Sequence, residues 1–355
     1  MRVADTIIPL KTPRSVMAAL LDHFGEHGTV TGHEEAWSVA FEIGTASARL
    51  LDGSISFQVE APDDTSLSYL QWGVVEHVLE FAPAEQPNVV WRGGFAQGSQ
   101  LPYFREMRVL SARNVTPRMR RITLAGENLE RFARHGMHVR LLLRPRPDTD
   151  VVWPVMAADG RQAWPEGERP VPRVYTLRRI DVAAGTVEID FVLHEGDDMP
   201  GARFGAEAKP GDLVGMTGPG GGTLKPSPSY LFLGDETALP AIGRLLEELP
   251  DGAMAKAYVE IADDAERQDI ALKPGVELVW LSRGGKLAGS TDGILQALRD
   301  VPDAFWGDDP YVWAGCEQST ARAIKAHLAD TVQLKKGRSV VGTYWKRGAA
   351  GEVDE

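Results

Sequence analysis

The sequence predicts a multidomain protein in which a small α+β domain is followed by a strand-rich domain and then by a doubly wound parallel α/β domain. The chain has 355 residues, enough for about two or three domains of ordinary size. Its middle part holds many short strand candidates punctuated by Pro and Gly, which is typical of an antiparallel barrel or sandwich. Its last part alternates mostly between strand and helix candidates, which is typical of a parallel sheet. The predicted boundaries are 1–95 for the first domain, 96–105 for a linker, 106–224 for the second domain and 225–355 for the third.

The composition is that of an ordinary globular protein, with 43% hydrophobic and 25% charged residues. A net charge of -12 argues against nucleic acid as the main partner, because phosphate backbones need a basic surface. The single cysteine, Cys316, excludes an internal disulfide and favours a reducing compartment. The N-terminal stretch lacks the apolar core of a signal peptide, and no apolar run reaches the roughly 18 residues of a membrane span. We therefore expect a cytoplasmic protein without a membrane segment.

Local patterns in the first domain predict two helices and three strands. Pro13 lies in the first turn of one helix candidate, where proline is favoured. Asp52-Gly53 separates two apolar runs and is a strong hairpin signal. The helix candidates are 12–28 and 66–82, the strand candidates are 36–44, 46–51 and 54–61, and the Gly-rich stretch 93–102 is a plausible linker.

The second domain has six strand candidates, one of which has two mixed faces. They are 107–117, 119–126, 138–145, 173–180, 186–194 and 212–219. In RVYTLRRI (173–180), side chains alternate between faces. One face then carries Arg173, Tyr175, Leu177 and Arg179, and the other carries Val174, Thr176, Arg178 and Ile180. A half-buried strand normally places its apolar residues on one side, so this pattern suggests contact with something besides a core.

The third domain places its polar motifs after its strands, where doubly wound sheets bind ligands. In YLFLGDETALPAI, Gly234 permits a tight turn and 235–238 enter a helix whose free amides suit a polar ligand, although an ordinary capped turn fits equally. The strand candidates are 230–235, 256–263, 277–283, 311–317 and 339–345, and the helix candidates are 238–249, 290–300 and 319–330.

Three further stretches fit either a structural or a binding role. Pro200-Gly201-Ala202-Arg203 suits a close phosphate contact or a plain loop. The glycine-rich run 215–224 is better explained as a hinge than as a phosphate cradle, because no P-loop lysine and helix follow. The basic segment 335–347 contains no acidic residue, and it suits an anionic ligand or a solvated face. Trp345, beside Lys346, is placed to stack on a planar ligand.

Other residues do not support a catalytic or metal site. His23 and His27 have the i, i+4 spacing of a metal-binding pair, but no HExxH pattern or further ligand accompanies them. We interpret them as core or surface histidines and predict no metal site. The sequence also contains no G-x-S-x-G, so serine-hydrolase chemistry is not supported.

Several motifs in one order give the chain a family resemblance. The most specific is Gly234-Asp235-Glu236-Thr237-Ala238-Leu239-Pro240-Ala241-Ile242. The others are RVYTLR from Arg173, HVRL from His138, the phrase around His194, Trp313-Ala314 with Glu317, and YWKRG from Tyr344. Over about 107–348 the chain resembles the siderophore-interacting protein family, FAD-dependent ferric-siderophore reductases related to ferredoxin reductases. Residues 1–95 resemble a small domain of unknown function that is found alone or fused to this family.

The resemblance implies an antiparallel FAD-binding β-barrel followed by an α/β domain that binds NADPH or NADH. The implied reaction moves electrons from the nicotinamide through FAD to siderophore-bound ferric iron. A general flavin or quinone reductase and a non-catalytic siderophore-binding protein are the alternatives. No catalytic acid, base or nucleophile is implied, since the chemistry belongs to the cofactor.

The resemblance also implies roles for individual residues. Arg173 would pair with FAD phosphate, Tyr175 would pack on the isoalloxazine, and Thr176 would bond near the ring nitrogen that takes hydride. Gly201, Ala202 and Arg203 would surround the pyrophosphate. Arg283 and Lys286 would read a 2′-phosphate, which favours NADPH. The remaining predicted cofactor residues are His194, Gly234, Asp235, Glu236, Thr237, Ala238 and Glu317, and the predicted siderophore contacts are Trp345, Lys346 and Arg347.

Two positions depart from the family pattern. The pyrophosphate loop usually reads Gly-Pro-Ala-x-x-Trp-Ala, whereas this chain has MPGARFG, with Phe204 in place of the tryptophan. Cys316 stands where the family usually has glycine before Glu317. We expect FAD binding to be retained, with altered contacts in the pyrophosphate loop.

Overall fold

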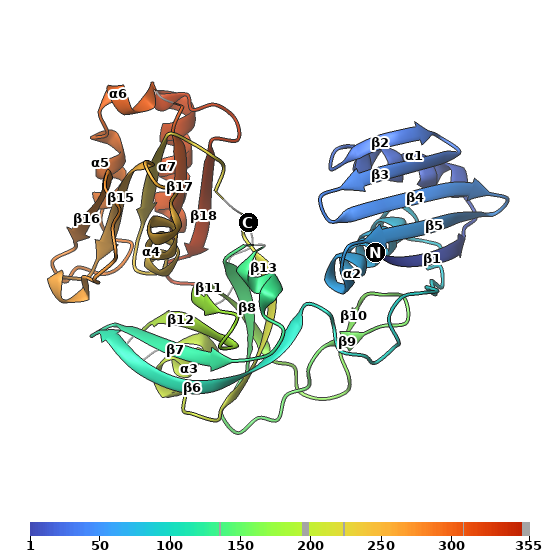
Figure 1. Ribbon diagram of the computed structural model, residues 1–355, viewed down its shortest axis with the longest axis horizontal. Coiled ribbons are helices and arrows are strands. Elements are labelled where there is room, and N and C mark those ends of the chain that lie inside the picture. The colour runs from blue at the N-terminus through green and yellow to red at the C-terminus, as the bar shows by residue number, and fades with distance from the viewer. Residues whose placement is uncertain (135, 194–198, 223, 308, 350–355) are drawn as a thin grey trace. The chain divides into compact units, whose positions relative to one another are not determined.

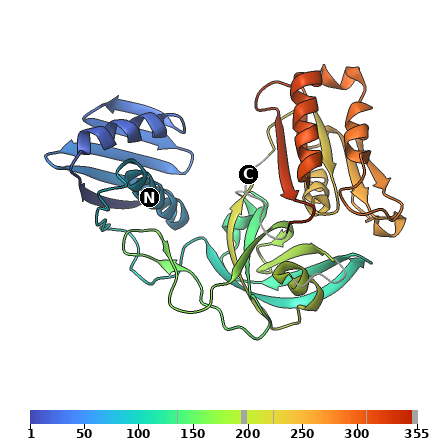
Figure 2. The same cartoon turned by 180° about the vertical axis from the view of Figure 1, so that it is seen from behind.

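The computed structural model describes residues 1–134, 136–193, 199–222, 224–307 and 309–349, which form two compact units. The first unit consists of Met1–Phe104 with Asp150–Arg169, and the second of Arg105–Thr149 with Pro170–Glu355. Figures 1 and 2 show their elements from opposite sides. Within the described residues, no helix is long and apolar enough to cross a membrane.

The first unit is built on a five-stranded antiparallel sheet in the order β1-β5-β4-β3-β2. The three predicted strands are present, and Gly53 forms the expected hairpin turn with a φ of +66°. The outer strands β1 and β2 were not predicted. In β1, Ala4, Thr6 and Ile8 alternate with exposed residues, whereas every residue of β2 is exposed. The strands are Arg2–Pro9 (β1), Thr29–His33 (β2), Ala36–Phe41 (β3), Gly44–Leu51 (β4) and Ser54–Ala61 (β5).

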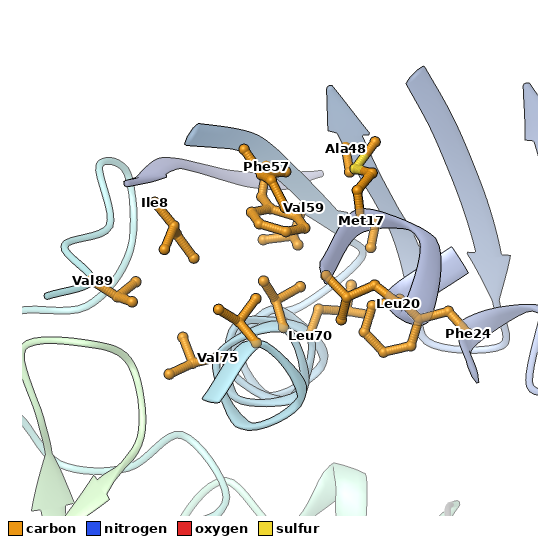
Figure 3. Packing of buried hydrophobic residues seen from close by; sticks show 14 of the residues in the cluster. Ile8, Met17, Leu20, Phe24, Ala48, Phe57, Val59, Leu70, Val75 and Val89 are labelled. Carbon is orange, nitrogen blue, oxygen red and sulfur yellow. The ribbon is translucent and has the colours of Figure 1, made fainter. Parts of the chain in front are cut away.

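Both predicted helices pack on this sheet through apolar side chains (Figure 3). Helix α1 spans Pro13–Gly25, and α2 spans Asp64–Phe81. The carboxylate of Asp63 caps α2 by accepting a hydrogen bond from the backbone N–H of Ser66 at 2.9 Å. Burying each large side chain stabilises the unit by about 1.5–3 kcal/mol. The core includes Leu20 and Phe24 from α1, Leu70 and Val75 from α2, and Phe57 and Val59 from β5.

The segment Asp150–Arg169 packs in this first unit, although in the sequence it lies between two strands of the barrel described below. It carries the short strands β9 (Val155–Met156) and β10 (Gln162–Ala163). The indole N–H of Trp91 donates to the carbonyl oxygen of Asp159 at 2.9 Å. The backbone N–H of Met156 donates to the carbonyl of Ser99 at 2.9 Å. These contacts explain why Asp150–Arg169 belongs with the N-terminal residues.

The second unit begins with a closed barrel in the strand order β11-β12-β7-β6-β13-β8. All six predicted strands form, and closure shows that the domain is a barrel rather than a sandwich. Its interior is apolar and includes the fully buried side chains of Phe132, Ile122 and Phe191. The strands are Phe104–Thr116 (β6), Met119–Ala125 (β7), His138–Leu143 (β8), Val171–Asp181 (β11), Thr186–Val192 (β12) and Leu213–Gly220 (β13), and helix α3 spans Pro200–Glu207.

The α/β domain is a five-stranded parallel sheet in the order β16-β15-β14-β17-β18, as the alternating pattern predicted. Every residue of β14 and β17 is buried, because these strands lie in the middle of a sheet covered on both faces. The strands are Ser229–Gly234 (β14), Met254–Ile261 (β15), Val276–Ser282 (β16), Tyr311–Glu317 (β17) and Ser339–Trp345 (β18). The helices are Leu239–Glu248 (α4), Gly293–Arg299 (α5), Asp303–Trp306 (α6) and Gln318–His327 (α7).

The mixed faces of strand β11 are explained in part by the contact between barrel and α/β domain. Arg178 is buried, and its guanidinium donates two hydrogen bonds of 2.7 Å to the carboxylate of Glu247 in α4. Arg244, also in α4, donates to the carbonyl oxygen of Leu177 at 3.0 Å. Burial opposes ionisation of Glu247, but the hydrogen bonds and charge of Arg178 outweigh it and lower the pKa of this carboxyl. One face of β11 therefore anchors the α/β domain.

Substituting Glu247→Met should lower the free energy of unfolding by about 3 kcal/mol, because Arg178 then stays buried without a carboxylate. The double variant Arg178→Met, Glu247→Met should recover much of this loss. Because the folded-state pKa of Glu247 is depressed, the pair's contribution is present above the unfolded pKa and is lost as pH falls through the folded pKa. Denaturant titrations of both variants at neutral and acidic pH measure these changes in the free energy of unfolding. A single variant as stable as the wild type at neutral pH would contradict the prediction.

Candidate active site

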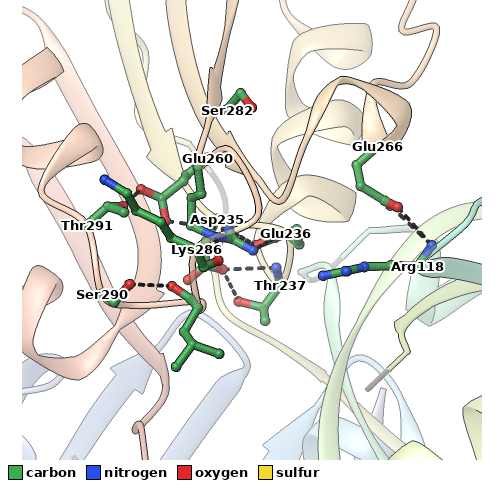
Figure 4. A network of polar contacts seen from close by, with 12 residues as sticks. Arg118, Asp235, Glu236, Thr237, Glu260, Glu266, Ser282, Lys286, Ser290 and Thr291 are labelled. Carbon is green, nitrogen blue, oxygen red and sulfur yellow. Dashed lines mark hydrogen bonds and ion pairs between the residues drawn. The ribbon is translucent and has the colours of Figure 1, made fainter. Parts of the chain in front are cut away.

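The ends of three neighbouring strands carry a buried polar network (Figure 4). Glu236 follows β14, Glu260 lies near the end of β15, and Arg283 follows β16. All three side chains are less than 9% exposed. Parallel strands end at the same edge of a sheet, and doubly wound folds bind their ligands there. The structure therefore brings the predicted residues of the Gly234 loop and of the loop after β16 together.

The turn after β14 is crowded and leaves room only for glycine at position 234. A Cβ added to Gly234 would lie 2.7 Å from Cβ of Ala238 and 3.0 Å from the carbonyl oxygen of Gly315. The next residue, Asp235, accepts hydrogen bonds from the backbone N–H of Thr237 at 2.9 Å and from the indole of Trp345 at 2.8 Å. Burial raises the pKa of the Asp235 carboxyl, and the bonds from Thr237 and Trp345 act in the opposite direction. Asp235 thus joins this turn to the last strand.

The Arg283 guanidinium is enclosed by acidic side chains. It donates to both carboxylate oxygens of Glu236, at 2.8 and 2.5 Å, and lies 3.5 Å from Glu260. The hydroxyl of Thr291 donates to Glu260, and burial raises the pKa of the Glu260 carboxyl against the effects of Thr291 and Arg283. Lys286, in contrast, is exposed. The prediction that Arg283 and Lys286 read a 2′-phosphate stays a prediction, and this pairing does not favour it for Arg283.

The predicted siderophore contacts lie at the end of β18, beside Glu317. The Glu317 carboxylate accepts from the backbone N–H of Ser319 at 2.6 Å and of Arg347 at 3.2 Å. Burial opposes ionisation of Glu317, but the hydrogen bond from the Ser319 hydroxyl, together with those from the backbone, lowers its pKa overall. Trp345 is half-buried, whereas Lys346 and Arg347 are exposed. The segment therefore presents two cations next to an indole that Asp235 holds in place.

On the barrel, Arg173 and Tyr175 of β11 lie against the start of helix α3. A Cβ added to Gly201 would lie 2.5 Å from the hydroxyl oxygen of Tyr175 and 3.8 Å from Cγ of Arg173. The ring of Tyr175 packs on the ring of Phe191 with 4.3 Å between centroids. Both Arg173 and Tyr175 are partly exposed. The structure thus brings three of the sequence-predicted residues together.

The segment Pro200–Glu207 is a helix rather than the loop that the sequence suggested. Phe204, in place of the family's tryptophan, packs on Phe191 with 5.6 Å between ring centroids. Arg203 donates to the carbonyl oxygen of Pro145 at 2.7 Å, and Ala202 is half-buried beside it. Thr176 is buried in β11 opposite His138 of β8. His194, also predicted, lies outside the described residues.

A contact between His138 and Tyr344 was not anticipated as part of the site. The imidazole Nε2 of His138 lies 2.7 Å from the hydroxyl oxygen of Tyr344 in β18, so the barrel and the α/β domain meet here. Burial, with a smaller effect of Arg244, lowers the pKa of His138 to about 4, which keeps the imidazole neutral at pH 7. Burial also raises the pKa of Tyr344. Both residues belong to matched motifs, but no local signal pairs side chains so far apart in sequence.

The barrel residues have the chemistry that FAD requires. Close packing at Gly201 brings backbone next to the ring of Tyr175 and the aliphatic part of the Arg173 side chain. An aromatic ring suits the planar flavin, and a cation with the amides at a helix start suits a pyrophosphate. Tyr175 with Thr176 would hold the ring end of the cofactor, and Arg173 with the start of α3 would hold its phosphates.

Comparison with known proteins identifies the class. Residues 108–223 match the siderophore-interacting FAD-binding domain, and 227–348 match the siderophore-interacting protein model. Residues 5–92 match an uncharacterized protein conserved in bacteria. The chain is therefore a flavin-dependent oxidoreductase with an FAD-binding domain.

It belongs to the siderophore-interacting protein family. An NADPH-dependent ferric-chelate reductase of Escherichia coli is 30% identical, over 68% of this chain and 92% of its own. The ferric vibriobactin reductase of Vibrio cholerae is 28% identical, over 66% of this chain and 86% of its own. The crystal structure of a siderophore utilization protein from T. fusca is 33% identical, covers 73% of this chain and 99% of its own, and superposes with a TM-score of 0.59.

Proposed function

We propose that this protein is a ferric-siderophore reductase that moves electrons from NADPH or NADH, through FAD, to siderophore-bound ferric iron and releases ferrous iron. Relatives named ferric reductases support the reaction class. The observation that carries the proposal is at the end of β18, where exposed Lys346 and Arg347 follow an indole bonded to Asp235. A cationic pair at this position suits an anionic ferric complex next to the nucleotide-binding edge.

The reaction needs a group that exchanges a hydride pair for single electrons, and FAD supplies this chemistry when bound. One nicotinamide donor carries two electrons, so it can reduce two ferric complexes. Siderophore oxygens are hard anionic ligands that fit ferric iron far better than ferrous iron, so reduction loosens the metal. The protein's own task is to bind and orient the partners, and no side chain is required as an acid or base.

The residues divide this task between the two domains. In the barrel, Arg173 would hold a phosphate of FAD, and Tyr175 and Thr176 would hold its ring. In the α/β domain, the Gly234 turn would face the nicotinamide, and Trp345 would stack on the siderophore. The other proposed contacts are Gly201, Ala202 and Arg203 for the pyrophosphate, Asp235, Glu236, Thr237, Ala238 and Glu317 for the nucleotide side, and Lys346 and Arg347 for the siderophore. A cytoplasmic location, favoured by the single free cysteine, stays a prediction.

One assay separates this function from its two rivals. Purified protein supplied with FAD is mixed with NADH or NADPH, with a ferric siderophore, with a quinone, or with neither, and ferrous iron is trapped with a chromogenic chelator. We expect nucleotide oxidation coupled to trapped iron when the siderophore is present. Oxidation with quinones but no trapped iron would favour a general flavin reductase. No nucleotide oxidation and no flavin uptake would favour a non-catalytic siderophore-binding protein. The altered MPGARF segment is the reason for considering this alternative.

A further inference from the structure

Glu236, Glu260 and Arg283 occupy three adjacent strand ends, at the place where a doubly wound fold meets the ribose end of a dinucleotide. Strand β15 lies between β14 and β16, and Ile261 pairs with Ser282 in register. This register places the last residues of β15 beside the first residues of the loop after β16. An arginine in that loop is the residue type that would accept a 2′-phosphate.

In this chain the guanidinium of Arg283 already has protein partners on all of its nitrogens. Its terminal nitrogens donate to Glu236, one of them also lies 3.5 Å from Glu260, and Nε donates to the carbonyl oxygen of Lys286 at 3.3 Å. Arg283 is only 6% exposed. A paired bidentate guanidinium is a strong interaction, so a phosphate would have to displace a carboxylate.

The buried charges of Arg283, Glu236 and Glu260 together do not attract a phosphate in either protonation state of Glu260. With both glutamates ionised, two carboxylates face one guanidinium. With Glu260 protonated, Glu236 alone cancels the charge of Arg283. A phosphate monoester adds about −1.5 to −2 charge at pH 7. Charges of the same sign brought together in a desolvated site suppress binding of the wrong partner.

We propose that Glu236 sets the donor specificity of this reductase by sequestering Arg283, so that the preferred donor is NADH, which lacks the 2′-phosphate. This inference rests on the proposed function and goes beyond it by choosing between the two nucleotides. The sequence favoured NADPH because Arg283 was expected to contact the 2′-phosphate. In this proposal Arg283 is instead held by Glu236. Lys286 is exposed in the same loop. If the protein preferred NADPH, Lys286 would be the cation that binds the 2′-phosphate.

The test compares the wild type with Glu236→Gln, which removes the negative charge that holds Arg283. Two quantities are measured: the rate constant of anaerobic flavin reduction by NADH and by NADPH, and the dissociation constants of NAD⁺ and NADP⁺ by calorimetry. We expect the wild type to favour NADH by about tenfold or more in both. Glu236→Gln should reduce that ratio by about threefold or more. The control is Glu277→Gln, which removes an exposed carboxylate of β16 that pairs with Lys256.

Equal or better use of NADPH by the wild type would overturn the proposal, and this comparison stands even if Glu236→Gln fails to fold. A folded Glu236→Gln protein with an unchanged ratio would overturn the role of Glu236. If neither nucleotide reduces the flavin, the proposal also fails. In that case, release of ferrous iron by dithionite-reduced protein would still support the ferric-siderophore reductase function. If NADH reduces the flavin rapidly but no iron is then released, the donor preference is supported and the ferric-siderophore reductase function is contradicted.

Discussion

Replacing Gly201 with Val should weaken FAD retention, with the affinity for FAD falling about tenfold or more. A Cβ at this position would lie 2.5 Å from the hydroxyl oxygen of Tyr175, so the ring or helix α3 must move. Overpacking of this kind costs about 1–3 kcal/mol, which corresponds to about tenfold or more in affinity at the upper half of that range. Tyr175→Ala, which removes the ring itself, should also weaken flavin retention. The measurement is the flavin absorbance per protein after purification and after titration with FAD.

The matched control for this prediction is Gly220→Val in β13 of the same barrel. A Cβ added there would meet no atom within 4 Å, so we expect flavin content close to that of the wild type. Thermal unfolding of each variant without FAD separates loss of cofactor from loss of fold. Full occupancy in Gly201→Val and in Tyr175→Ala would remove the start of α3 and Tyr175 from the flavin site.

Replacing Lys346 and Arg347 together with Ala should raise the KM for an anionic ferric siderophore about tenfold, while flavin reduction by the nucleotide is unchanged. Both cations are exposed, so their contribution to binding is a charge attraction that solution ions screen. Their loss should therefore also flatten the dependence of KM on salt concentration. Steady-state iron release at several ionic strengths measures both effects.

Lys335 and Lys336 offer a control that removes the same charge from the same basic segment. Lys335 is paired with exposed Asp309 at 3.2 Å, and Lys336 is exposed. Their double Ala variant should keep the wild-type KM. Equal increases in the two double variants would mean that overall charge, rather than the end of β18, governs siderophore binding.

Much of the fold is predictable because it follows from local patterns. Short apolar runs bounded by Pro and Gly identified the barrel strands, and the alternation of strands with helices identified the parallel sheet. Helix α3 was missed because Gly201 and Gly205 disfavour a helix, whereas packing of Phe204 and Gly205 on Phe191 stabilises it. The placement of Asp150–Arg169 with the N-terminal unit depends on contacts such as Trp91 with Asp159, which no local pattern encodes.

The candidate site was predicted as a set of residues, but not as a set of contacts. The glycine at 234 and the mixed faces of β11 were visible in the sequence, because both break the ordinary pattern of a strand. The partners were not visible: Glu236 and Arg283 are 47 residues apart, and Arg178 and Glu247 are 69 apart. The role of Arg283 at a 2′-phosphate stays a prediction, and its carboxylate partners could not be predicted from the sequence.

The most direct test of the central claim is a single turnover without oxygen. FAD-loaded protein is reduced by one equivalent of NADH, freed of nucleotide, and mixed with excess ferric siderophore and a ferrous chelator. We predict that two ferrous ions are trapped for each reduced flavin, and that they form as the spectrum of the oxidised flavin returns. A flavin that stays reduced in the presence of the ferric complex, with no ferrous iron trapped, would contradict a ferric-siderophore reductase.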